Sequence, residues 1–529
     1  MELHGANILG SETSGAGATV FHGVNPATGE QLAPAYHEAT EREISRALEL
    51  AGEAFAGFRS RKPEQRADFL EAIAAGLEQL GDELLDRAAA ETALPLPRLV
   101  SERGRTCAQL RMFAALLREG SWVGAIIDRA QPERTPAPKP DLRRMLIPIG
   151  PIVVFGASNF PFAYSVAGGD TASALAAGNP VVAKGHPAHP GASELAGRVI
   201  QQAARDCGMP AGVFSLVHGP SPAVGQSLVR HPLASGVGFT GSLAAGRALF
   251  DAAAARPDPI PVFAEMGSLN PVFVLPGALQ ERGPEIADAL ARSVTQGLGQ
   301  FCTKPGLAVG LGGAELDAFT RRLSEAVGAT PAGTMLHAGI AERYRGGIAE
   351  RGGMTGIATA CAPAAAAPHA GATGAVFTTD AKTYLSNRKL HEELFGPQTL
   401  VVASDSASRL LEIARRLEGQ LTVTIHASAS DLRQHAALLD VLRQKAGRLV
   451  FGGVPTGVEV VPAMQHGGPY PATTDSRFSS VGTTAIRRWV RPVCYQNFPA
   501  EWLPDELKDD NPRGIWRMID GEWTRAAVV

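Results

Sequence analysis

The stretch GQFCTKPG at residues 299–306 places Cys302 among turn-forming glycine and proline residues. A cysteine that serves only packing normally lies in an apolar run, because a thiol packs like a small hydrophobic group. Cys302 is therefore a candidate nucleophile. A reactive thiol needs help to ionise, donors for the negative charge that forms on its target, and a base that activates water to release the product.

Two other side chains could supply these functions. Glu265 in VFAEMGSLNP lies between apolar neighbours, so we expect burial to raise its pKa into the range of a general base. Asn159 in FGASNFPF follows a predicted buried strand and could direct its amide at an oxyanion. Each also has a structural interpretation, as a buried glutamate satisfied by backbone amides and as an asparagine that caps its own turn.

If the target is an aldehyde, a hydride acceptor must also be held, and GFTGSLAAG at 238–246 is the candidate cradle. A predicted strand enters a turn at Gly241 and Ser242, and a helix follows with Gly246 in its first turns. A helix N-terminus attracts phosphate, although the pattern is not GxGxxG and a glycine turn before a helix is often turn chemistry alone. Lys184 ends the strand VVAK, where it could meet a ribose or phosphate or simply be solvated.

The surrounding elements predict a layered α/β architecture. Helical periodicity covers 41–60, 64–92 and 102–118. Four prolines in QPERTPAPKP predict an exposed connector. Strands and helices then alternate for more than 100 residues, which indicates a parallel, doubly wound sheet that binds ligands beyond the carboxyl ends of its strands. A second α/β block follows from about 262 to 450.

Composition limits the function classes. A chain of 529 residues is too long for a single core, and 45% hydrophobic with 19% charged residues is typical of a globular protein. The net charge of −3 offers no basic footprint for nucleic acid. We expect the short basic stretch IRRWVR (486–491) to form a strand with one solvated face.

The five cysteines are widely spaced and contain no CxxC, so neither a disulfide framework nor a metal site is indicated. No uninterrupted apolar run is long enough for a membrane span. The first residues show no secretory or transit pattern, and we therefore expect a cytoplasmic protein.

Six motifs in this order resemble the NAD(P)-dependent aldehyde dehydrogenases, and the resemblance covers nearly the whole chain. They are GASNFPFA, PVVAKGHPAHP, GFTGS, FAEMGSLNP, GQFCTKPG and EELFGP. The resemblance implies the α/β aldehyde dehydrogenase fold, with a Rossmann-like cofactor domain, an α/β catalytic domain and a small oligomerisation arm. The implied divisions are 1–125, 143–262 and 452–485 for the cofactor domain, 263–451 for the catalytic domain, and 126–142 and 486–529 for the arm and tail.

The resemblance also implies a role for each motif residue. Cys302 would attack the aldehyde and form a thiohemiacetal and then a thioester, Asn159 and the Cys302 N–H would bind the oxyanion, and Glu265 would activate water. The implied cofactor-binding residues are Lys184 at the adenosine ribose, Gly241, Ser242 and Gly246 at the pyrophosphate, and Glu393 and Phe395 of HEELFGP at the nicotinamide ribose and ring.

The histidine-bearing KGHPAHP and the tail RPVCYQNFPAEWLPDELKDDNPRGIWR carry a narrower resemblance, to the NADP-preferring bacterial branch that includes 2,5-dioxovalerate (α-ketoglutarate semialdehyde) dehydrogenase. Pro187 stands where NAD-preferring members often carry a glutamate that would repel a 2′-phosphate. We therefore expect NADP to be preferred and NAD also to be accepted. His186 could lie near that phosphate or be a structural turn residue.

The substrate is expected to be α-ketoglutarate semialdehyde, oxidised to 2-oxoglutarate. The residues expected to line its tunnel, by motif position, are Phe160, Tyr164 and Phe478. Arg292 could bind the far end of the substrate or be a surface residue. The alternative within the family is a medium- or long-chain fatty aldehyde, which would need an apolar tunnel.

Two other classes compete with this interpretation. A CoA-acylating dehydrogenase would use the same thioester, but Glu265 favours hydrolysis. A non-catalytic structural protein on this fold is disfavoured by intact Cys302, Glu265 and Asn159. The resemblance implies a homodimer or homotetramer with a small-molecule aldehyde as substrate and neither a metal, a nucleic acid nor a membrane as partner. Lys304 and Pro305 depart from the GQxCxxxxR of many relatives, and the sequence offers no explanation for them.

Overall fold

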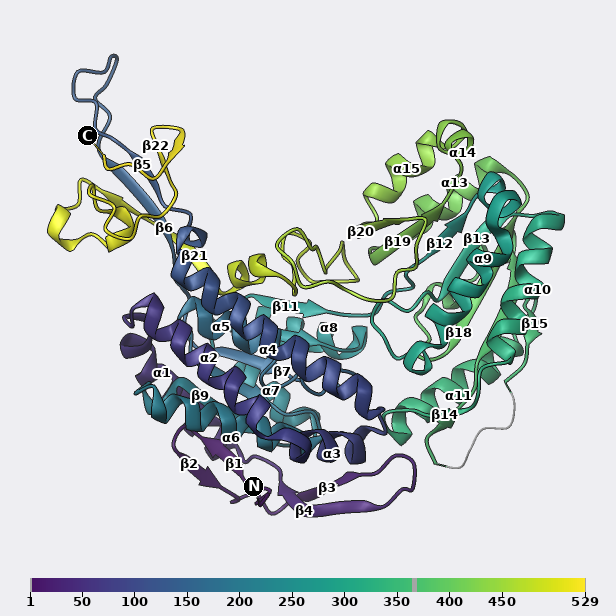
Figure 1. Cartoon of the computed structure of the whole chain (residues 1–529), viewed down its shortest axis with the longest axis horizontal. Helices are drawn as coiled ribbons and strands as arrows, with labels where there is room; N and C mark the ends of the chain where they lie inside the picture. Colours follow the sequence, from purple (N-terminus) through teal and green to yellow (C-terminus); the bar gives the residue numbers. More distant parts are fainter. Residues whose placement is uncertain (1, 364–368, 529) are drawn as a thin grey trace.

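Three large β-sheets give the chain its architecture, and the computed structural model describes residues 2–363 and 369–528. Two sheets have seven strands each and one has five. In Figure 1 the first sheet and its helices form the lower left of the molecule, the second lies at the right, and the third extends from the upper left.

The first sheet has five parallel strands and two antiparallel edge strands, in the order β11-β10-β7-β8-β9-β1-β2. Its strands are β1 (Asn7–Leu9), β2 (Glu12–Ser14), β7 (Ile152–Phe155), β8 (Val181–Lys184), β9 (Phe214–Val217), β10 (Gly236–Thr240) and β11 (Val262–Glu265). The alternation of strands and helices therefore predicted this doubly wound sheet correctly.

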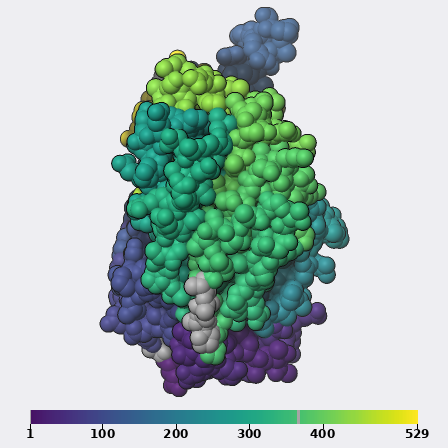
Figure 2. Space-filling model, turned by 90° about the vertical axis from the view of Figure 1, so that its right-hand side faces the viewer, coloured from purple at the N-terminus to yellow at the C-terminus, as the bar shows by residue number. Residues whose placement is uncertain are grey.

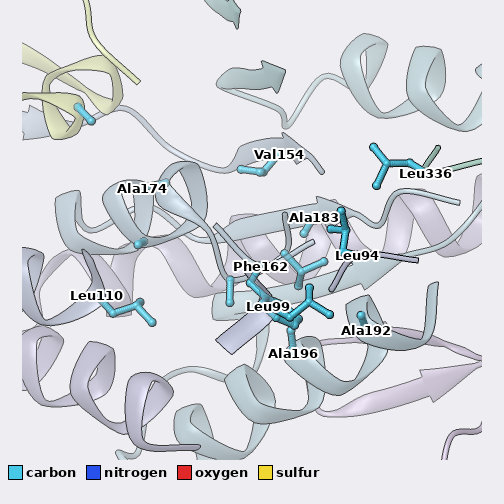
Figure 3. Close-up of a cluster of buried hydrophobic side chains, with 14 of the residues drawn as sticks. Leu94, Leu99, Leu110, Val154, Phe162, Ala174, Ala183, Ala192, Ala196 and Leu336 are labelled. Atoms are coloured by element: carbon cyan, nitrogen blue, oxygen red, sulfur yellow. The ribbon is translucent and has the colours of Figure 1, made fainter. Parts of the chain in front are cut away.

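Helices cover both faces of this sheet, because successive strand side chains point to opposite faces. Ile152 and Val154 of β7 join one apolar cluster, whereas Val153 and Phe155 join another. Figure 3 shows part of the first cluster, where β7 and β8 pack against side chains of α4 and α6. The helices are α1 (Glu41–Arg59), α2 (Pro63–Gln79), α3 (Gly81–Thr92), α4 (Leu96–Glu119), α5 (Gly169–Ala177), α6 (Pro190–Asp206), α7 (Pro222–Arg230) and α8 (Leu243–Ala254).

The second sheet has the order β15-β17-β18-β13-β12-β19-β20 and is parallel except for β15. Its strands are β12 (Val272–Val274), β13 (Leu307–Leu311), β15 (Ala358–Cys361), β17 (Ala375–Asp380), β18 (Gln398–Ser404), β19 (Gln420–His426) and β20 (Ala446–Phe451). Its helices are α9 (Pro276–Thr295), α10 (Ala314–Gly328), α11 (Ala338–Gly352), α12 (Ala381–Ser386), α13 (Ala407–Arg416), α14 (Ala429–Gln434) and α15 (Ala436–Arg443).

The third sheet combines segments that are far apart in the sequence, in the order β21-β6-β5-β22-β23. Its strands are β5 (Ile126–Asp128), β6 (Leu142–Pro148), β21 (Val490–Gln496), β22 (Arg517–Ile519) and β23 (Glu522–Thr524). The connector between β5 and β6 stands clear of the body at the top of Figure 2. Two short pairs complete the strands, β3 (Val20–Val24) with β4 (Gln31–His37) and β14 (Gly333–Thr334) with β16 (Gly371–Ala372).

The strand expected over 486–491 is wrong. Residues Thr483–Trp489 form a 3-10 helix, and β21 begins only at Val490. The Trp489 indole is buried and donates to the Ser173 hydroxyl at 2.7 Å. Arg488 is buried beside it and pairs with Asp170 at 2.7 Å. The basic residues therefore partly serve packing, which the alternation of polar and apolar residues did not reveal.

Two chain crossings join the first and second sheets. Residues 266–271 run from β11 to β12, and the segment after β20 returns to pair Thr473 with Glu265. The predicted boundary between 262 and 263 falls inside β11. Because Glu265 ends β11 and Cys302 lies shortly before β13, both crossings lead to the place where the candidate residues meet. Among the described residues, no helix is both long and apolar enough to cross a bilayer.

Candidate active site

Cys302 lies on a turn that follows a short 3-10 helix (Gln296–Gly299) and precedes β13. Asn270 holds this turn, since its side-chain amide donates to the carbonyl oxygens of Cys302 at 2.9 Å and Lys304 at 3.0 Å. Asn270 itself has φ 47°, a left-handed conformation that asparagine tolerates better than most residues. Its N–H and the Ser268 hydroxyl both donate to Oε1 of Gln420. The nucleophile turn is thereby fixed from the crossing segment.

The Cys302 thiol faces a histidine and a glutamate. Its Sγ lies 3.4 Å from Nε2 of His466, and the same nitrogen lies 3.0 Å from Oε1 of Glu265. The Ser480 hydroxyl donates to the other Glu265 oxygen at 2.8 Å. Glu265 and His466 are both buried, so the interactions among the three groups are stronger than they would be in water.

The charge state of Glu265 differs from the sequence-based prediction. Burial tends to raise its pKa, but the charge and hydrogen bond of His466, with hydrogen bonds from Ser480 and Cys302, lower it below the ordinary value. The expected rise is therefore wrong, because the sequence did not show these partners. Burial and then the Glu265 carboxylate raise the pKa of the Cys302 thiol well above its usual range. The resting pair is a neutral thiol beside a carboxylate.

The same three residues are the one group of metal-ligand type found among the described residues. Single ligand atoms of Glu265, Cys302 and His466 all lie within 4.8 Å of one another. Thiolate, imidazole and carboxylate also form a zinc donor set. A bound metal would, however, occupy the sulfur that a nucleophile needs free, so the arrangement suits proton transfer better.

Asn159 reaches the nucleophile turn from the first sheet. It follows β7 and is buried, and its side-chain amide donates to the Gln300 carbonyl at 3.1 Å, two residues before Cys302. Arg98 of α4 donates to the Asn159 backbone carbonyl at 2.6 Å. Asn159 is therefore held beside the cysteine by one hydrogen bond from its side chain and one to its backbone carbonyl.

Aromatic rings form a wall next to Cys302. Phe160 packs edge-on against Phe301 and Tyr164, with ring centroids 5.6 and 5.2 Å apart, and the Tyr164 ring lies 6.3 Å from that of His466. Phe160 and Tyr164, two of the expected tunnel residues, therefore do lie at the nucleophile.

Two arginines of α4 pack against these aromatic rings. The Arg105 guanidinium lies 5.5 Å from the centroid of Tyr164 and donates to its hydroxyl at 3.2 Å. Arg98 lies over Phe160 and Phe301, at 5.1 and 4.8 Å. Arg105 and, from β20, Arg448 both interact electrostatically with Cys302. Their buried Nε atoms have no hydrogen-bond acceptor. Cationic groups thus approach the site from both sheets.

The third expected tunnel residue, Phe478, and the separate candidate Arg292 lie elsewhere. Phe478 packs against Phe263 at 5.1 Å and lines a cavity of about 20 Å³ together with Glu265, His466 and Ser480. It is thus near Glu265, behind the thiol. Arg292 is exposed on α9 and interacts with Asp288, which matches the surface alternative given for it from the sequence. Helical periodicity did not show which face of α9 is solvated.

The candidate cofactor cradle lies at the carboxyl ends of β8 and β10. Ser242 caps α8 through Oγ, which accepts from the Ala245 N–H, and the first turn of α8 is exposed. Gly241 directly precedes this cap. Gly246 instead is buried, and an added Cβ there would lie 2.7 Å from Met266. The glycine at 246 thus allows α8 to pack on the residue after Glu265.

Lys184 ends β8 and is nearly enclosed, and burial lowers its pKa to about 8. Glu38, which accepts from the Ser221 N–H at 2.9 Å, interacts with it electrostatically. His186 accepts from the Ala188 N–H through Nδ1 and stacks on His189. Burial, and then His189 and Lys184, lower the pKa of His186 well below its usual value. Pro187 is partly exposed between these groups.

Glu393 and Phe395 lie in the loop before β18. An added Cβ at Gly267 would lie 2.7 Å from a Glu393 oxygen, so the carboxylate rests directly on the crossing segment. Burial raises the pKa of Glu393 to about 7, against the attraction of Lys304. Phe395 packs against the largest apolar cluster.

Sequence comparison defines the family. A model of the aldehyde dehydrogenase family matches residues 13–468. The chain belongs to the aldehyde dehydrogenase family. Alpha-ketoglutaric semialdehyde dehydrogenase 2 of Azospirillum brasilense is 48% identical over 523 residues, covering 99% of this chain and 100% of that protein. Alpha-ketoglutaric semialdehyde dehydrogenase of Acinetobacter baylyi is 46% identical over 531 residues, covering 99% of each chain.

The fold is also that of the family. The crystal structure of indole-3-acetaldehyde dehydrogenase from P. syringae, in complex with NAD+ and IAA, superposes with a TM-score of 0.79 at 21% identity, covering 94% of this chain and 97% of that one. The resemblance and the fold class inferred from the motifs are thus confirmed. Members of the family use NAD or NADP.

Several site residues of this aldehyde dehydrogenase were missed from sequence. They are Asn270, His466, Ser480, Arg105 and Arg448. Asn270 lay inside the quoted motif FAEMGSLNP, and an asparagine before proline could have been examined as a turn residue. His466 stands in MQHGGP, 164 residues from the cysteine it contacts, with no local pattern that names its partner.

Replacing Glu265 tests the electrostatic relation between the thiol and the carboxylate. Because the Glu265 charge helps to raise the pKa of Cys302, Glu265→Gln should increase the fraction of thiolate. We expect alkylation of Cys302 by iodoacetamide at pH 7.5 to accelerate about tenfold, the effect of one pKa unit. Mass spectrometry of the Cys302 peptide separates this reaction from that of the exposed Cys494. Glu392→Gln, at an exposed neighbour of Glu393, is the matched control, and an unchanged or slower alkylation of Glu265→Gln would contradict this prediction.

Proposed function

We propose that this aldehyde dehydrogenase oxidises α-ketoglutarate semialdehyde to 2-oxoglutarate with NADP as the preferred cofactor. The observation that carries the proposal is the convergence of Cys302, Glu265 and His466 at the junction of the two sheets. Two relatives named alpha-ketoglutaric semialdehyde dehydrogenase, each aligned over its full length, support the choice of substrate.

Cys302 is the proposed nucleophile. Its sulfur bonds to the aldehyde carbon, the carbonyl oxygen becomes the thiohemiacetal oxyanion, and the thiol proton passes to Glu265, either directly or through His466. The Asn159 amide and the Cys302 N–H are the oxyanion donors, and the loss of one such donor typically costs about 3–4 kcal/mol of barrier. In the resting state Asn159 is bonded to Gln300, and this bond must yield to the oxyanion.

Glu265 is the proposed base for release of the acid. The cavity of about 20 Å³ beside it is large enough for one water molecule. Glu265 first releases the proton that it took from the thiol to solvent, and is then a carboxylate again. It takes a proton from water, the resulting hydroxide attacks the thioester carbon, and the carbon–sulfur bond breaks to return the thiolate. Since His466 and Ser480 hold Glu265 as a carboxylate, the base is ready at neutral pH.

The residues at the carboxyl ends of β8 and β10 fit a dinucleotide. An exposed helix N-terminus behind a glycine suits the pyrophosphate, so Gly241, Ser242 and the first turn around Gly246 are proposed to hold it. Lys184 is proposed to bind the adenosine ribose, and Glu393 and Phe395 the nicotinamide ribose and ring. The cofactor, when bound, supplies the acceptor for the hydride that leaves the thiohemiacetal carbon.

The preference for NADP rests on the surroundings of Lys184. Residues 185–190 carry no acid, and the carboxylate of Glu38 is engaged by the Ser221 N–H. Lys184 and His186 can then face a 2′-phosphate with no acid in the turn that follows Lys184, and Glu38 is the acid that interacts with Lys184 from another segment. A phosphate there would favour protonation of His186, which is neutral in its absence.

The substrate choice rests on the arginines behind the aromatic wall. A short aldehyde with an α-keto carboxylate at its far end needs a cation within a few ångströms of the aldehyde carbon. Arg105 and Arg448 supply positive charge from opposite sides, and each has a buried Nε with no acceptor. A fatty aldehyde would gain nothing from these charges, so they favour the semialdehyde over the apolar alternative.

The assembly and location are proposed on separate grounds. The exposed aromatic side chains of the C-terminal tail suit burial in a homodimer or homotetramer, and they are Phe498, Trp502, Trp516 and Trp523. The third sheet is the proposed oligomerisation arm, with the cofactor and catalytic domains built on the first and second sheets. Five cysteines without a disulfide are consistent with a cytoplasmic protein.

A cofactor and aldehyde screen tests the proposed function. We expect NADPH formation with α-ketoglutarate semialdehyde, at a kcat/KM orders of magnitude above that for hexanal, and no dependence on CoA. Cys302→Ala should remove the activity, since no other side chain can form the thioester. Higher kcat/KM for hexanal and longer aldehydes would favour the fatty aldehyde alternative, and acyl-CoA formation would favour the acylating one.

Arg105→Gln tests the proposed substrate contact. Loss of a charge-assisted hydrogen bond should raise KM for α-ketoglutarate semialdehyde about 10- to 100-fold. The KM for hexanal should stay within about threefold, because hexanal carries no charge. Arg103→Gln, on the same helix but bonded to the Gly81 carbonyl, is the matched control. Equal losses for both aldehydes would mean that Arg105 only supports Tyr164.

Pro187→Glu tests the cofactor preference. A carboxylate near the 2′-phosphate should lower kcat/KM for NADP by about tenfold or more, as expected for a nearby like charge, and change kcat/KM for NAD much less. Pro187→Gln introduces a side chain of nearly the same size as glutamate but without the charge. It should keep the wild-type ratio of kcat/KM for NADP to kcat/KM for NAD. If wild type strongly prefers NAD, or if both variants behave alike, the charge argument is wrong.

A further inference from the structure

Lys304, two residues after the nucleophile, is one of the largest fully buried side chains among the described residues. A buried ammonium is costly unless it is hydrogen-bonded and paired. The mechanism above gives this lysine no role, and the sequence alone did not explain it. Its position beside Cys302 therefore requires a physical reason.

The Lys304 ammonium bonds the loop that precedes β18. Its Nζ donates to the carbonyl oxygens of Leu394 and Gln398, each at 3.2 Å. Gly306 leaves space for this conformation, since an added Cβ there would lie 3.0 Å from Nζ. The Lys304 side chain in CTKPG thus folds back over the backbone of Gly306, and the absence of a side chain at Gly306 makes room for it.

The same loop docks directly against the nucleophile turn. Gly299 has φ 63°, and an added Cβ there would lie 2.3 Å from the carbonyl oxygen of Gly396. The Glu393 carboxylate rests on Gly267 of the crossing segment, two residues from Glu265. The turn, the loop and the crossing segment therefore meet without intervening side chains, and Lys304 is the cation at their junction.

Lys304 and Glu393 set each other's charge. Burial raises the pKa of Glu393 to about 7, the Lys304 charge opposes this rise, and the Glu265 carboxylate adds to it. Burial likewise lowers the pKa of Lys304 to about 8, with Glu393 opposing and Arg351 adding to the decrease. Glu393 also helps to raise the pKa of the Cys302 thiol. Without the ammonium, the pKa of Glu393 would rise further, and less of the carboxyl group would be ionised at pH 7.5.

We propose that Lys304 is a positioning residue that ties the loop Glu393–Gln398 to the Cys302 turn and keeps Glu393 in its carboxylate form. The carboxylate can then accept hydrogen bonds from the ribose hydroxyls at the nicotinamide end of the cofactor. This inference rests on the proposed function, since it assigns Glu393 to the cofactor.

Binding of NADPH, followed by its fluorescence, tests the proposal without turnover. Lys304→Met should raise the dissociation constant at pH 7.5 about 10- to 100-fold, as expected for the loss of a charge-assisted hydrogen bond. Lys389→Met, at an exposed lysine paired with Glu350, should bind within twofold of wild type. Equal binding by wild type and a folded Lys304→Met variant would overturn the proposal.

A double-mutant cycle separates positioning through Glu393 from a general loss of structure. Lys304→Met should weaken NADPH binding less than about threefold when Glu393→Gln is already present. The same loss in both backgrounds would overturn the proposal, because the lysine would then act independently of Glu393.

The pH profile remains informative if Lys304→Met does not fold. Wild-type binding should weaken as pH falls through about 7, where Glu393 takes up its proton. Glu393→Gln should lack this transition and retain only those of the cofactor's own phosphate and of Lys184 and His186 beside it. In a folded Lys304→Met the transition should move upward. Superimposable profiles for wild type and Glu393→Gln would overturn the proposal. The proposed function fails separately, if wild type forms no NADPH from any aldehyde.

Discussion

The side chain of Asn270 is the contact on which the rest of the site depends. It lies in the six-residue crossing from the first sheet to the second, and its amide donates to the carbonyls on both sides of Thr303. The turn that carries Cys302 has no strand or helix of its own to fix it. Because Glu265 ends the strand just before the crossing, one short segment sets both the position of the thiol and that of the carboxylate facing it.

Burial of several charges in a small volume follows from this arrangement. Glu265 and Lys304 are buried, and each lies against oriented hydrogen-bonding groups, which are His466 and the Ser480 hydroxyl for Glu265 and backbone carbonyls for Lys304. In a medium of low polarity such groups stay charged only when partner charges and hydrogen bonds satisfy them. The thiol beside them is neutral, since burial and then the Glu265 charge oppose its ionisation. In the resting site Glu265, the base, is therefore a carboxylate. The Cys302 thiolate forms only when an acceptor takes the thiol proton.

The sequence allowed prediction of features that depend on local order. The doubly wound sheet followed from alternating strands and helices, and Asn159, Glu265 and Cys302 could be selected because each follows a strand or interrupts a pattern. Partners that arrive from distant segments could not be predicted. His466 and Ser480 come from the return crossing, more than 160 residues from Cys302 and Glu265, and without them the pKa of Glu265 was predicted in the wrong direction. The sequence left two alternatives for Arg292 for a related reason, since a helix pattern gives two faces but does not say which one meets the site.

The origin of the positive charge also bears on how a substrate is held. Arg105 belongs to α4, which covers the first sheet, whereas Arg448 belongs to β20 of the second. An anionic substrate attached to Cys302 would interact with both and so join the two bodies across the seam. An uncharged aldehyde would lack this interaction and would depend on apolar contacts such as those with the packed rings of Phe160, Phe301 and Tyr164. Contacts of the charged end with both arginines would favour one relative position of the two sheets. That position also aligns the reacting groups that each sheet carries, so the charged end of the substrate can contribute to catalysis as well as to affinity.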